Sequence, residues 1–565
     1  MKKTFSLAIV CLMILSLVLS ACGTTAPASS SAAPSAPAAP ASSSASVNPA
    51  DVAPPADDGS WTSPGGIKYP LEGKPKLTWY YELAANNYIK DETENTAFIQ
   101  AMEATGVELE FRHPVVGQEV QTLNLMMASG DLTDMIYRTD VRYEPGFDFG
   151  LQEGLFIDHD ELLKAYAPDY MAIVNSEDDL KRQVATDQGK IRGFAMMTVD
   201  SEGFDMLPLR IELPASGPAI RKDILDKLGL DVPKTIADWD KALRAMKADG
   251  VEIPLMIWNV TDTIDKDVGT FITAYGIAPE FYIKDGKVLY GPAQDEMKNY
   301  LELMRSWYAD GLIDREWPTR KAADAEALIF NAANTKNVGA YTRYTTAYPL
   351  QAHNMGLEMV GTPIPVLNDI SEINWRQNNN LSRGYITTIT SACKTPEAAA
   401  MFLNYGYTDP GYKLYNYGID GVNYDGFDAN GIPQYIGVFK TEWDARRESF
   451  RLHNGSYLKS DYRCNPRSTA LDGTLYQYRQ EWGKPSNDYV LPPFSMTADE
   501  GKESASIMAD IVTLREEMFT KFIIGSIPMS DFENVFQPAV ESMNLARACE
   551  IREDAVARYW AREIN

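Results

Sequence analysis

The chain has 565 residues, of which 45% are hydrophobic, and this is enough apolar sequence for more than one domain core. Lysine and arginine number 52 against 78 aspartate and glutamate, so the formal net charge at pH 7 is −26. A surface this acidic repels phosphates and anionic lipid headgroups, which argues against binding nucleic acid or anionic membranes through a broad basic face.

The chain begins with a pattern typical of an export signal. Lys2 and Lys3 precede an apolar segment at 7–19, which is too short to cross a bilayer, since a span needs about 20 residues. The segment ends in Leu19-Ser20-Ala21-Cys22, which resembles a bacterial lipobox. The resemblance implies cleavage before Cys22 and acylation of Cys22, with chains such as palmitate. The alternatives are an ordinary signal, in which Cys22 lies near the cut by accident, and an uncleaved anchor.

Residues 1–22 are therefore predicted to be a lipoprotein signal peptide, and 23–65 a disordered linker. Up to about residue 60 the linker is almost entirely Ala, Ser, Pro and Thr, so it has almost no large apolar side chain to bury. Folded sequence is expected to begin near Trp61. A Pro-rich chain extends by about 3 Å per residue, so the linker reaches up to roughly 100 Å from the membrane.

The region 66–207 is predicted to be the first part of lobe 1. β-branched and aromatic runs predict strands at 77–83, 107–112 and 135–137, with helices at 93–105 and 118–128 between them. This alternation favours a parallel sheet with helices on both faces. Ligands bind at the carboxyl ends of the strands in such sheets. The candidate ligand contacts there are Glu82, Asn86 and Asn87 after the first strand, and Tyr137 and Arg138 after the third.

The region 208–382 is predicted to be the first part of lobe 2. Strands are expected at 207–211, 250–258 and 338–341, and helices at 220–229, 236–246 and 295–308. Thr235 is expected to cap the second of these helices, and Asp285-Gly286 predicts a hairpin over 282–290. Lobe 1 is expected to resume at 383–430, with a strand at 384–389 and a helix at 395–405. Segment 431–565 is predicted to be turn-rich and aromatic, then helical at 497–522, 530–543 and 545–564, completing lobe 2 and the hinge.

Cysteines do not form a framework of disulfides in this sequence. Cys11 lies in the signal and Cys22 at the proposed lipid site, so Cys393, Cys464 and Cys549 remain, and three cannot all pair in one monomer. One bridge between two of them stays open, and Cys393 follows a β-rich run in which it is expected to be a small core residue.

Signatures of catalysis and of metal binding are mostly absent. The four histidines show no metal-ligand spacing, and no nucleophile elbow, phosphate loop or dinucleotide fingerprint occurs. The Asp and Asn residues between 420 and 430 do not fit a calcium loop and are expected to form turns. We therefore expect no enzyme, no cofactor and no metal. The competing class is an extracellular glycoside hydrolase, which would need two carboxylates about 5 to 10 Å apart.

Aromatic side chains recur beside polar ones throughout the chain. Aromatic faces cover the C–H faces of a sugar ring, while flanking amides and charged groups bond its hydroxyls. A protein with 11% aromatic residues also needs many of them in its core, so each position has both interpretations. The further candidate ligand contacts, chosen near strand ends and hinge passages, are Trp258, Tyr341, Trp375, Arg383, Tyr385 and Tyr417.

Four stretches together resemble a known family. They are the lipobox, 123–136 (LNLMMASGDLTDMI), 220–239 (IRKDILDKLGLDVPKTIADW), and 491–493 with 516–525 near the end. The chain is similar to the lipid-anchored extracellular solute-binding proteins of ABC importers, in the long oligosaccharide-binding branch of Gram-positive bacteria. The resemblance implies an α/β, two-lobe periplasmic-binding-protein-like fold of type II, with a hinge between the lobes and a helical C-terminal tail.

The resemblance also implies what the protein does. It would be a monomer on the outer face of the cytoplasmic membrane that captures a solute, an oligosaccharide first of all, and delivers it to ABC permease subunits. A peptide ligand and a role in serving a membrane sensor stay open as alternatives. In relatives that bind calcium an acidic loop precedes the Glu-Ile-Pro stretch, but the loop here, 247–251, has too few oxygen ligands, so no calcium is expected there.

Overall fold

The computed structural model describes residues 60–83, 88–143, 145–199, 214, 216–257, 270–320, 322–331, 336–345, 352–353, 355–368, 371–376, 382, 384–428, 433–440, 445–446, 457–459 and 474–562. The signal peptide, most of the predicted linker and the strand expected at 207–211 lie outside these residues. So do five residues singled out above, namely Asn86, Asn87, Trp258, Arg383 and Cys464. Within the described ranges, none of the helices combines the length and apolar character needed to span a bilayer.

The first sheet has the strand order β13-β5-β3-β4. β3 (Lys76–Tyr80) pairs in parallel with β4 (Glu108–Arg112) and with β5 (Met135–Tyr137), as expected from the alternation of strands and helices. β13 (Thr387–Ile389) pairs with β5 in the antiparallel direction. The sheet is therefore mixed and not purely parallel, because its edge strand returns from a much later part of the chain.

The helices around the first sheet follow local capping signals. The Asn95 side chain accepts hydrogen bonds from the backbone at the start of α1, which ends at Gly106 with a φ of 74°. The ring of Trp79 in β3 is 1% exposed and packs against Phe98 of α1 and Phe111 of β4. The helices are α1 (Thr96–Thr105), α2 (Glu119–Ser129), α3 (Thr139–Arg142), α4 (Gly146–Gln152), α5 (Asp160–Tyr166), α6 (Pro168–Val174), α7 (Asp178–Val184), α13 (Pro396–Tyr405) and α14 (Asp409–Tyr417).

A hairpin at the start of the described chain is fastened to this unit. β1 (Trp61–Thr62) pairs with β2 (Lys68–Tyr69), so the predicted linker boundary at residue 65 is too far along the chain. The buried carboxylate of Asp169 accepts hydrogen bonds from Ser63 Oγ (2.5 Å), Gly65 N (2.8 Å) and Asn404 Nδ2 (2.7 Å). One side chain of α6 thus ties the hairpin to α13.

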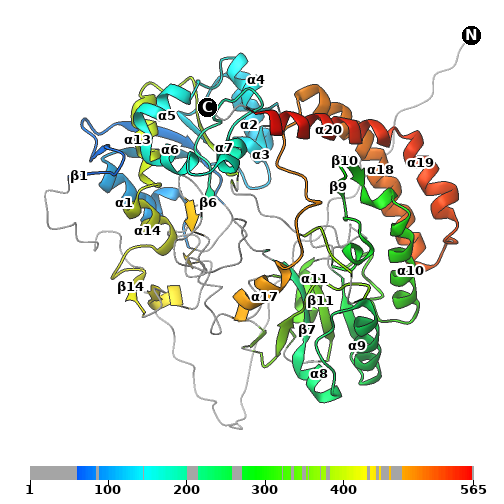
Figure 1. The fold of residues 1–565 in the computed structure, drawn as a ribbon. Coiled ribbons are helices and arrows are strands. Elements are labelled where there is room, and N and C mark those ends of the chain that lie inside the picture. The colour runs from blue at the N-terminus through cyan, green and yellow to red at the C-terminus, as the bar shows by residue number, and fades with distance from the viewer. Residues whose placement is uncertain are drawn as a thin grey trace, which may run out of the picture. The chain divides into compact units, whose positions relative to one another are not determined.

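The second sheet has the strand order β12-β7-β11-β8. β11 (Val338–Thr345) pairs in parallel with β8 (Ile253–Met256) and antiparallel with β7 (Ser216–Arg221), which also pairs antiparallel with β12 (Met359–Gly361). The helix expected at 220–229 is shorter, because its first two residues belong to β7. Figure 1 labels β7 and β11 of this sheet together with α8 (Lys222–Leu228) and α9 (Ile236–Ala248).

Several local predictions for this unit are confirmed. Thr235 and Asp238 form a capping box at α9. The hairpin of β9 (Phe281–Lys284) and β10 (Lys287–Tyr290) turns at Asp285 and Gly286, whose φ values are 53° and 77°. The remaining elements here are α10 (Glu296–Ala309), α11 (Ala322–Ile329) and α17 (Thr474–Trp482).

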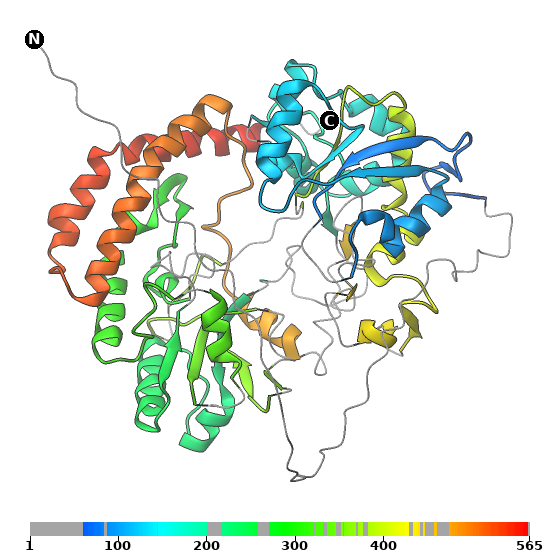
Figure 2. The same ribbon diagram turned by 180° about the vertical axis from the view of Figure 1, so that it is seen from behind.

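The helical C-terminal region packs on the second sheet's core. Phe519 and Phe522 of α18 (Ala498–Ile524) are fully buried in the cluster that contains Trp239 of α9 and Trp307 of α10. α20 (Leu545–Ala561) packs against α18, α19 (Gln537–Ser542) and β10, as both views show (Figures 1 and 2). A π-helical turn at Phe532–Phe536 precedes α19, so the helix expected at 530–543 is regular only in its second half.

Two smaller pairings complete the described fold. β6 (Met197–Val199) pairs in parallel with β16 (Tyr457–Lys459), and β14 (Tyr424–Phe427) pairs antiparallel with β15 (Pro433–Tyr435). Short turns of 3-10 helix lie at Glu92–Glu94, Ile272–Tyr275, Gly291–Ala293 and Gly437–Lys440. Cys393 is buried, as predicted, and both Cys393 and Cys549 are free thiols.

Candidate functional site

Polar and aromatic side chains meet at one edge of the first sheet. β3 and β5 run in parallel, so the residues that follow them, Glu82 and Arg138, emerge at the same edge. β13 is antiparallel to β5, with Thr387 opposite Tyr137, and so the residues before β13 reach this edge too. The strand topology therefore gathers three separate segments into one site.

A shared carboxylate holds two arginines at this edge. Glu82 Oε2 accepts a hydrogen bond from Arg138 Nη1 at 3.0 Å, and Arg142 Nε and Nη2 bond the two oxygens of Glu82 at 2.7 and 2.9 Å. Arg138 is the N-cap residue of α3 and Arg142 is its last residue, so this short helix sets the spacing of the two arginines. The Glu82 side chain is 10% exposed and each arginine 27% exposed. The hydrogen bond to Glu82 raises the pKa of the Arg142 guanidinium above its usual value.

Three tyrosine rings stack beside the arginines. The rings of Tyr81 and Tyr137 lie 4.8 Å apart and nearly parallel, and Tyr385 follows at 6.3 Å from Tyr137. The guanidinium of Arg138 lies 5.0 Å from the centre of the Tyr385 ring. Tyr81 and Tyr137 are 5% exposed, whereas Tyr385 is half-buried. Burial raises the pKa of Tyr137 well above its ordinary value, so this hydroxyl stays protonated.

The backbone at this edge is strained. Arg138 has a φ of 63° and Tyr385 a φ of 54°, which non-glycine residues seldom adopt. Such conformations cost about 1–3 kcal/mol each and persist where the surroundings fix them, commonly at ligand-binding sites. The backbone next to Tyr385 is held by Asp140, whose Oδ1 accepts a hydrogen bond from Ile386 N at 2.9 Å. A Cβ on Gly384 would lie 2.3 Å from Asp140 Oδ2, so glycine is required there.

Four of the predicted contacts therefore come together, namely Glu82, Tyr137, Arg138 and Tyr385. Three others lie elsewhere. Tyr341 is fully buried in a core cluster with Tyr478, and Trp375 packs half-buried against the core of the second sheet. Tyr417 is the last residue of α14, and its hydroxyl lies 3.3 Å from that of Tyr412 in a small cluster with Tyr424. Sequence reasoning missed Tyr81, Asp140 and Arg142. Helix α3 is too short to give a periodic signal, so nothing in the sequence marked Arg142.

A large cavity shares a wall with this site. Its volume is about 1010 Å³, and α3 and α4 line one side while residues 494–497 and Arg558 line another. We call it the α3 cavity. Asp140 and Arg142 line it as well. Because Arg142 also bonds Glu82, the cavity and the tyrosine stack are separated by little more than α3.

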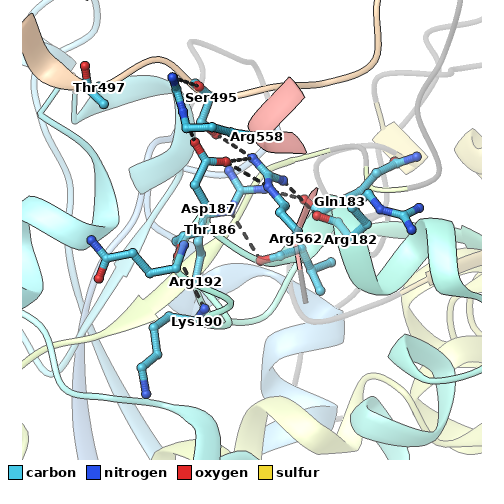
Figure 3. Close-up of polar contacts among 12 residues, drawn as sticks. Arg182, Gln183, Thr186, Asp187, Lys190, Arg192, Ser495, Thr497, Arg558 and Arg562 are labelled. Carbon is cyan, nitrogen blue, oxygen red and sulfur yellow. Dashed lines mark hydrogen bonds and ion pairs between the residues drawn. The ribbon is translucent and has the colours of Figure 1, made fainter. Parts of the chain in front are cut away.

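An ion-pair junction borders the same cavity. Asp187, which follows α7, bonds Arg562 at 2.6 Å (Nη2 to Oδ1) and Arg558 at 3.1 Å (Nε to Oδ2) (Figure 3). Arg558 also bonds both carboxylate oxygens of Glu500 at the start of α18, and Arg562 Nη1 donates to Arg182 O at 2.8 Å. The Arg562 side chain is 1% exposed. We call this group the Asp187 junction; it fastens the end of α20 to the loop after α7.

Within the described ranges, no three His, Cys, Asp or Glu side chains come together as a metal site. In the loop where calcium was not expected, the Asp249 carboxylate contacts Lys227 Nζ at 2.5 Å and Lys336 Nζ at 3.1 Å. The ammonium groups of Lys227 and Lys336 thus neutralise the Asp249 carboxylate charge that a bound cation would need.

Comparison with known proteins gives one family match. The family model described as bacterial extracellular solute-binding protein matches residues 86–413. A curated relative, the fructooligosaccharide ABC transporter substrate-binding protein FusA of Streptococcus pneumoniae, is 25% identical over 264 residues, which are 44% of this chain and 47% of that protein. The polygalacturonan/rhamnogalacturonan-binding protein YtcQ of Bacillus subtilis is 22% identical over 366 residues, covering 63% of this chain and 68% of that protein. The match thus spans about half the length of FusA.

Solved structures match over nearly their whole length. The S. pneumoniae FusA structure in complex with kestose has a TM-score of 0.68 at 19% identity, covering 86% of this chain and 100% of that chain. A human-milk-oligosaccharide (HMO) binding, ABC-transporter associated protein from Bifidobacterium longum infantis has a TM-score of 0.69 at 17% identity, with coverage of 86% and 99%. At these identities the likeness shows the fold.

Proposed function

Because the chain belongs to the bacterial extracellular solute-binding proteins and has their type II α/β fold, we propose that it captures an oligosaccharide and delivers it to an ABC permease. The observation that carries the proposal is the stack of Tyr81, Tyr137 and Tyr385 beside the Glu82 carboxylate and its two arginines. The relatives named above for fructooligosaccharides and pectic polysaccharides support a carbohydrate as the ligand class.

The chemistry of the site suits a sugar. The half-buried Tyr385 ring offers an apolar face for the C–H side of a pyranose or furanose ring. The Arg138 and Arg142 side chains keep partial exposure and offer N–H donors for hydroxyl groups. Since Glu82 orients both guanidinium groups before any ligand arrives, little ordering remains to be done on binding.

The mechanism is closure around the ligand. A sugar that contacts both lobes binds the closed state more tightly, so its differential affinity shifts the population towards closure. The strained backbone at Arg138 and Tyr385 holds one half of the site in a fixed shape, against which the other lobe closes. The permease would recognise the closed form.

The N-terminal Cys22 is proposed to carry the lipid anchor, which keeps the protein at the outer face of the cytoplasmic membrane. A Cys22→Ala variant should be released into the medium or retain its signal, while the wild type partitions with membranes after cleavage. If the processed Cys22→Ala chain stays membrane-bound, the anchor proposal fails and the uptake proposal is unaffected.

The experiment for function is a ligand screen on the soluble chain lacking residues 1–22. Thermal shift and calorimetry would be run with kestose, maltotriose, oligogalacturonate and a tripeptide mixture. A ligand at 100 times its dissociation constant adds about 2.7 kcal/mol to the free energy of unfolding, which is easily seen. We expect at least one sugar to stabilise the chain, without new reducing ends appearing. Stabilisation by peptides alone, or hydrolysis of a sugar, would overturn the proposal.

A further inference from the structure

The α3 cavity has a lining that the proposed sugar capture at the tyrosine stack does not use. Of its lining residues, only Asp140 and Arg142 also contribute to the tyrosine and arginine site. The cavity's volume of about 1010 Å³ is at the upper end of the usual range for small-molecule sites, roughly 300–1,000 Å³. A cavity of this size, lined mainly by α3, α4, residues that follow α7 and the segment before α18, is large enough for a small-molecule ligand.

The charges in the lining balance. Three carboxylates, Asp140, Asp148 and Asp187, face three guanidinium groups, those of Arg142, Arg192 and Arg558. Most are already paired, since Asp187 bonds Arg558 and Arg192 donates to the backbone carbonyls of Gln183 and Val184. A lining without net charge favours neither an anion nor a cation, and it presents fixed donors and acceptors to a neutral polar ligand.

Apolar faces lie among these polar groups. Tyr143 and Phe147 line the floor near α4 and are at most 8% exposed, whereas Phe149 is 41% exposed. Val120 and Val141 also line the cavity and are 42% and 59% exposed. Aromatic and aliphatic faces interleaved with orienting polar groups are the composition that buries sugar rings.

One polar atom in the lining lacks a partner. Asp148 Oδ1 is buried and has no hydrogen-bond partner within the described part of the chain, while Thr186 bonds the same carboxylate. A buried acceptor left unsatisfied is destabilising, and a ligand hydroxyl would supply the missing hydrogen bond. Asp148 thus supplies an independent sign that the cavity is built to receive a hydrogen-bond donor.

We propose that the α3 cavity is a second carbohydrate site, which binds a short neutral sugar with a hydroxyl donating to Asp148 Oδ1 and a ring face on Phe149. The sugar would touch α3 and α4 on one side and residues 494–497, next to the Asp187 junction, on the other. Occupation would brace these segments together. Through Arg142, which contributes to both places, it would stiffen the tyrosine site as well.

This inference rests on the proposed function, and its test separates the two. The soluble chain would be titrated with kestose and with maltotriose, in the wild type and in Tyr385→Ala, which removes the stacking ring. Hydrogen exchange monitored by mass spectrometry would follow 143–149 and 494–497 at millimolar sugar. In the Tyr385→Ala chain we expect exchange in these two segments to slow at least threefold with one of the sugars.

Variants of the cavity complete the test. Asp148→Ala removes the acceptor, and Phe149→Ala removes a ring that is 41% exposed and outside the buried core, so the second variant should fold even if the first does not. Each should abolish the slowing in the Tyr385→Ala background. Glu153→Ala, an exposed carboxylate at the end of the same helix and outside the cavity, is the matched control and should keep it.

Three results would overturn the inference. If the wild type binds a sugar but exchange in 143–149 and 494–497 is unchanged in Tyr385→Ala, the cavity is not a sugar site and the proposed function stands. If the slowing survives both cavity variants, it comes from elsewhere and the assignment is wrong. If kestose, maltotriose and oligogalacturonate all fail to bind the wild type, the proposed function fails, and this inference fails with it.

Discussion

The guanidinium carbon of Arg138 lies 5.0 Å from the ring centre of Tyr385, and the two residues share a rare backbone conformation, with φ values of 63° and 54°. Arg138 directly follows β5, and Tyr385 lies two residues before β13. Neither residue is a glycine, so the contacts around the pair must hold this strained backbone in place. We infer that these contacts keep the Arg138 guanidinium and the Tyr385 ring in a fixed arrangement for ligand binding.

Replacing Tyr385 tests the pair directly. Tyr385→Ala should weaken sugar binding about tenfold, since an aromatic contact contributes about 1–1.5 kcal/mol, and should leave the midpoint of thermal unfolding nearly unchanged because the ring is half-buried. The matched control is Tyr308→Ala, because Arg315 lies over Tyr308 at the same distance of 5.0 Å, in the second sheet's unit. Calorimetry showing equal losses in both variants would contradict the role given to Tyr385.

The Asp187 junction makes a prediction about stability. Arg562→Ala should lower the free energy of unfolding by about 3 kcal/mol, because it removes a buried guanidinium, which is 1% exposed, and takes one of two arginine partners from the Asp187 carboxylate. On the same helix, Arg547 bonds both oxygens of Glu503, but both side chains are exposed by a third or more. Arg547→Ala should therefore cost much less stability than Arg562→Ala. Urea unfolding of the two variants should rank them in this order, and the reverse order would refute the argument.

His159 should make stability depend on pH. Its ring is fully buried, Nε2 accepts a hydrogen bond from Ile389 N at 3.1 Å, and Nδ1 therefore carries the proton that it donates to Ile191 O at 3.2 Å. Burial lowers the pKa of His159 from 6.5 to about 4. The unfolded chain binds the proton first, so His159 contributes stability above pH 6.5 that is lost as the pH falls towards 4, amounting to about 3 kcal/mol.

Variants isolate this titration from that of the carboxylates. His159→Gln keeps a donor and an acceptor without the charge, so its free energy of unfolding should fall less than that of the wild type between pH 7 and pH 4. His353, which is exposed, supplies the control, and His353→Gln should follow the wild type. Parallel curves for His159→Gln and the wild type would show that His159 does not titrate in this window.

Asp169 should govern whether the N-terminal hairpin stays attached. Asp169→Ala removes the acceptor of three hydrogen bonds and should destabilise the chain by about 5 kcal/mol, since bonds to a charged group contribute about 1.5–3 kcal/mol each. Asp131→Ala is the control, because that carboxylate is 74% exposed and pairs with Arg112 at the surface. Limited proteolysis should cut the first variant near residues 63–68 and leave the second intact. Equal protection of the hairpin would contradict this account.

Much of the fold follows from local sequence. β5 at 135–137 agrees with its prediction residue for residue, because Met135, Ile136 and Tyr137 are all buried and Ser129-Gly130-Asp131 ends the preceding helix. The Asp285-Gly286 hairpin and the Thr235 cap are likewise set by residues within a few positions. The boundary of β7 was missed, because Ile220 and Arg221 fit a helical stripe and a buried strand equally well.

The site was predictable only in part, and the reason is topology. The strand-end rule places Glu82, Tyr137 and Arg138 at one edge, and Tyr385 joins them because β13 pairs with β5. The same rule selected Tyr341, yet that ring points into a core, since alternation along a strand does not say which face is covered. The contacts of Arg142 with Glu82 and of Arg562 with Asp187 depend on pairings across long sequence separations, which no local pattern reveals.

The attachment of Arg562 to Asp187 also sets an order of events during biogenesis. A chain that leaves the cell amino end first presents Asp187 and its neighbours 375 residues before Arg562 emerges, so this attachment forms only after α20 has been exported. Chains that stop before Arg558 because translation stalls would lack this attachment, and the loop after α7 would then lose its contacts with α20. Proteases outside the cell would then have a means of removing incomplete copies while sparing finished ones.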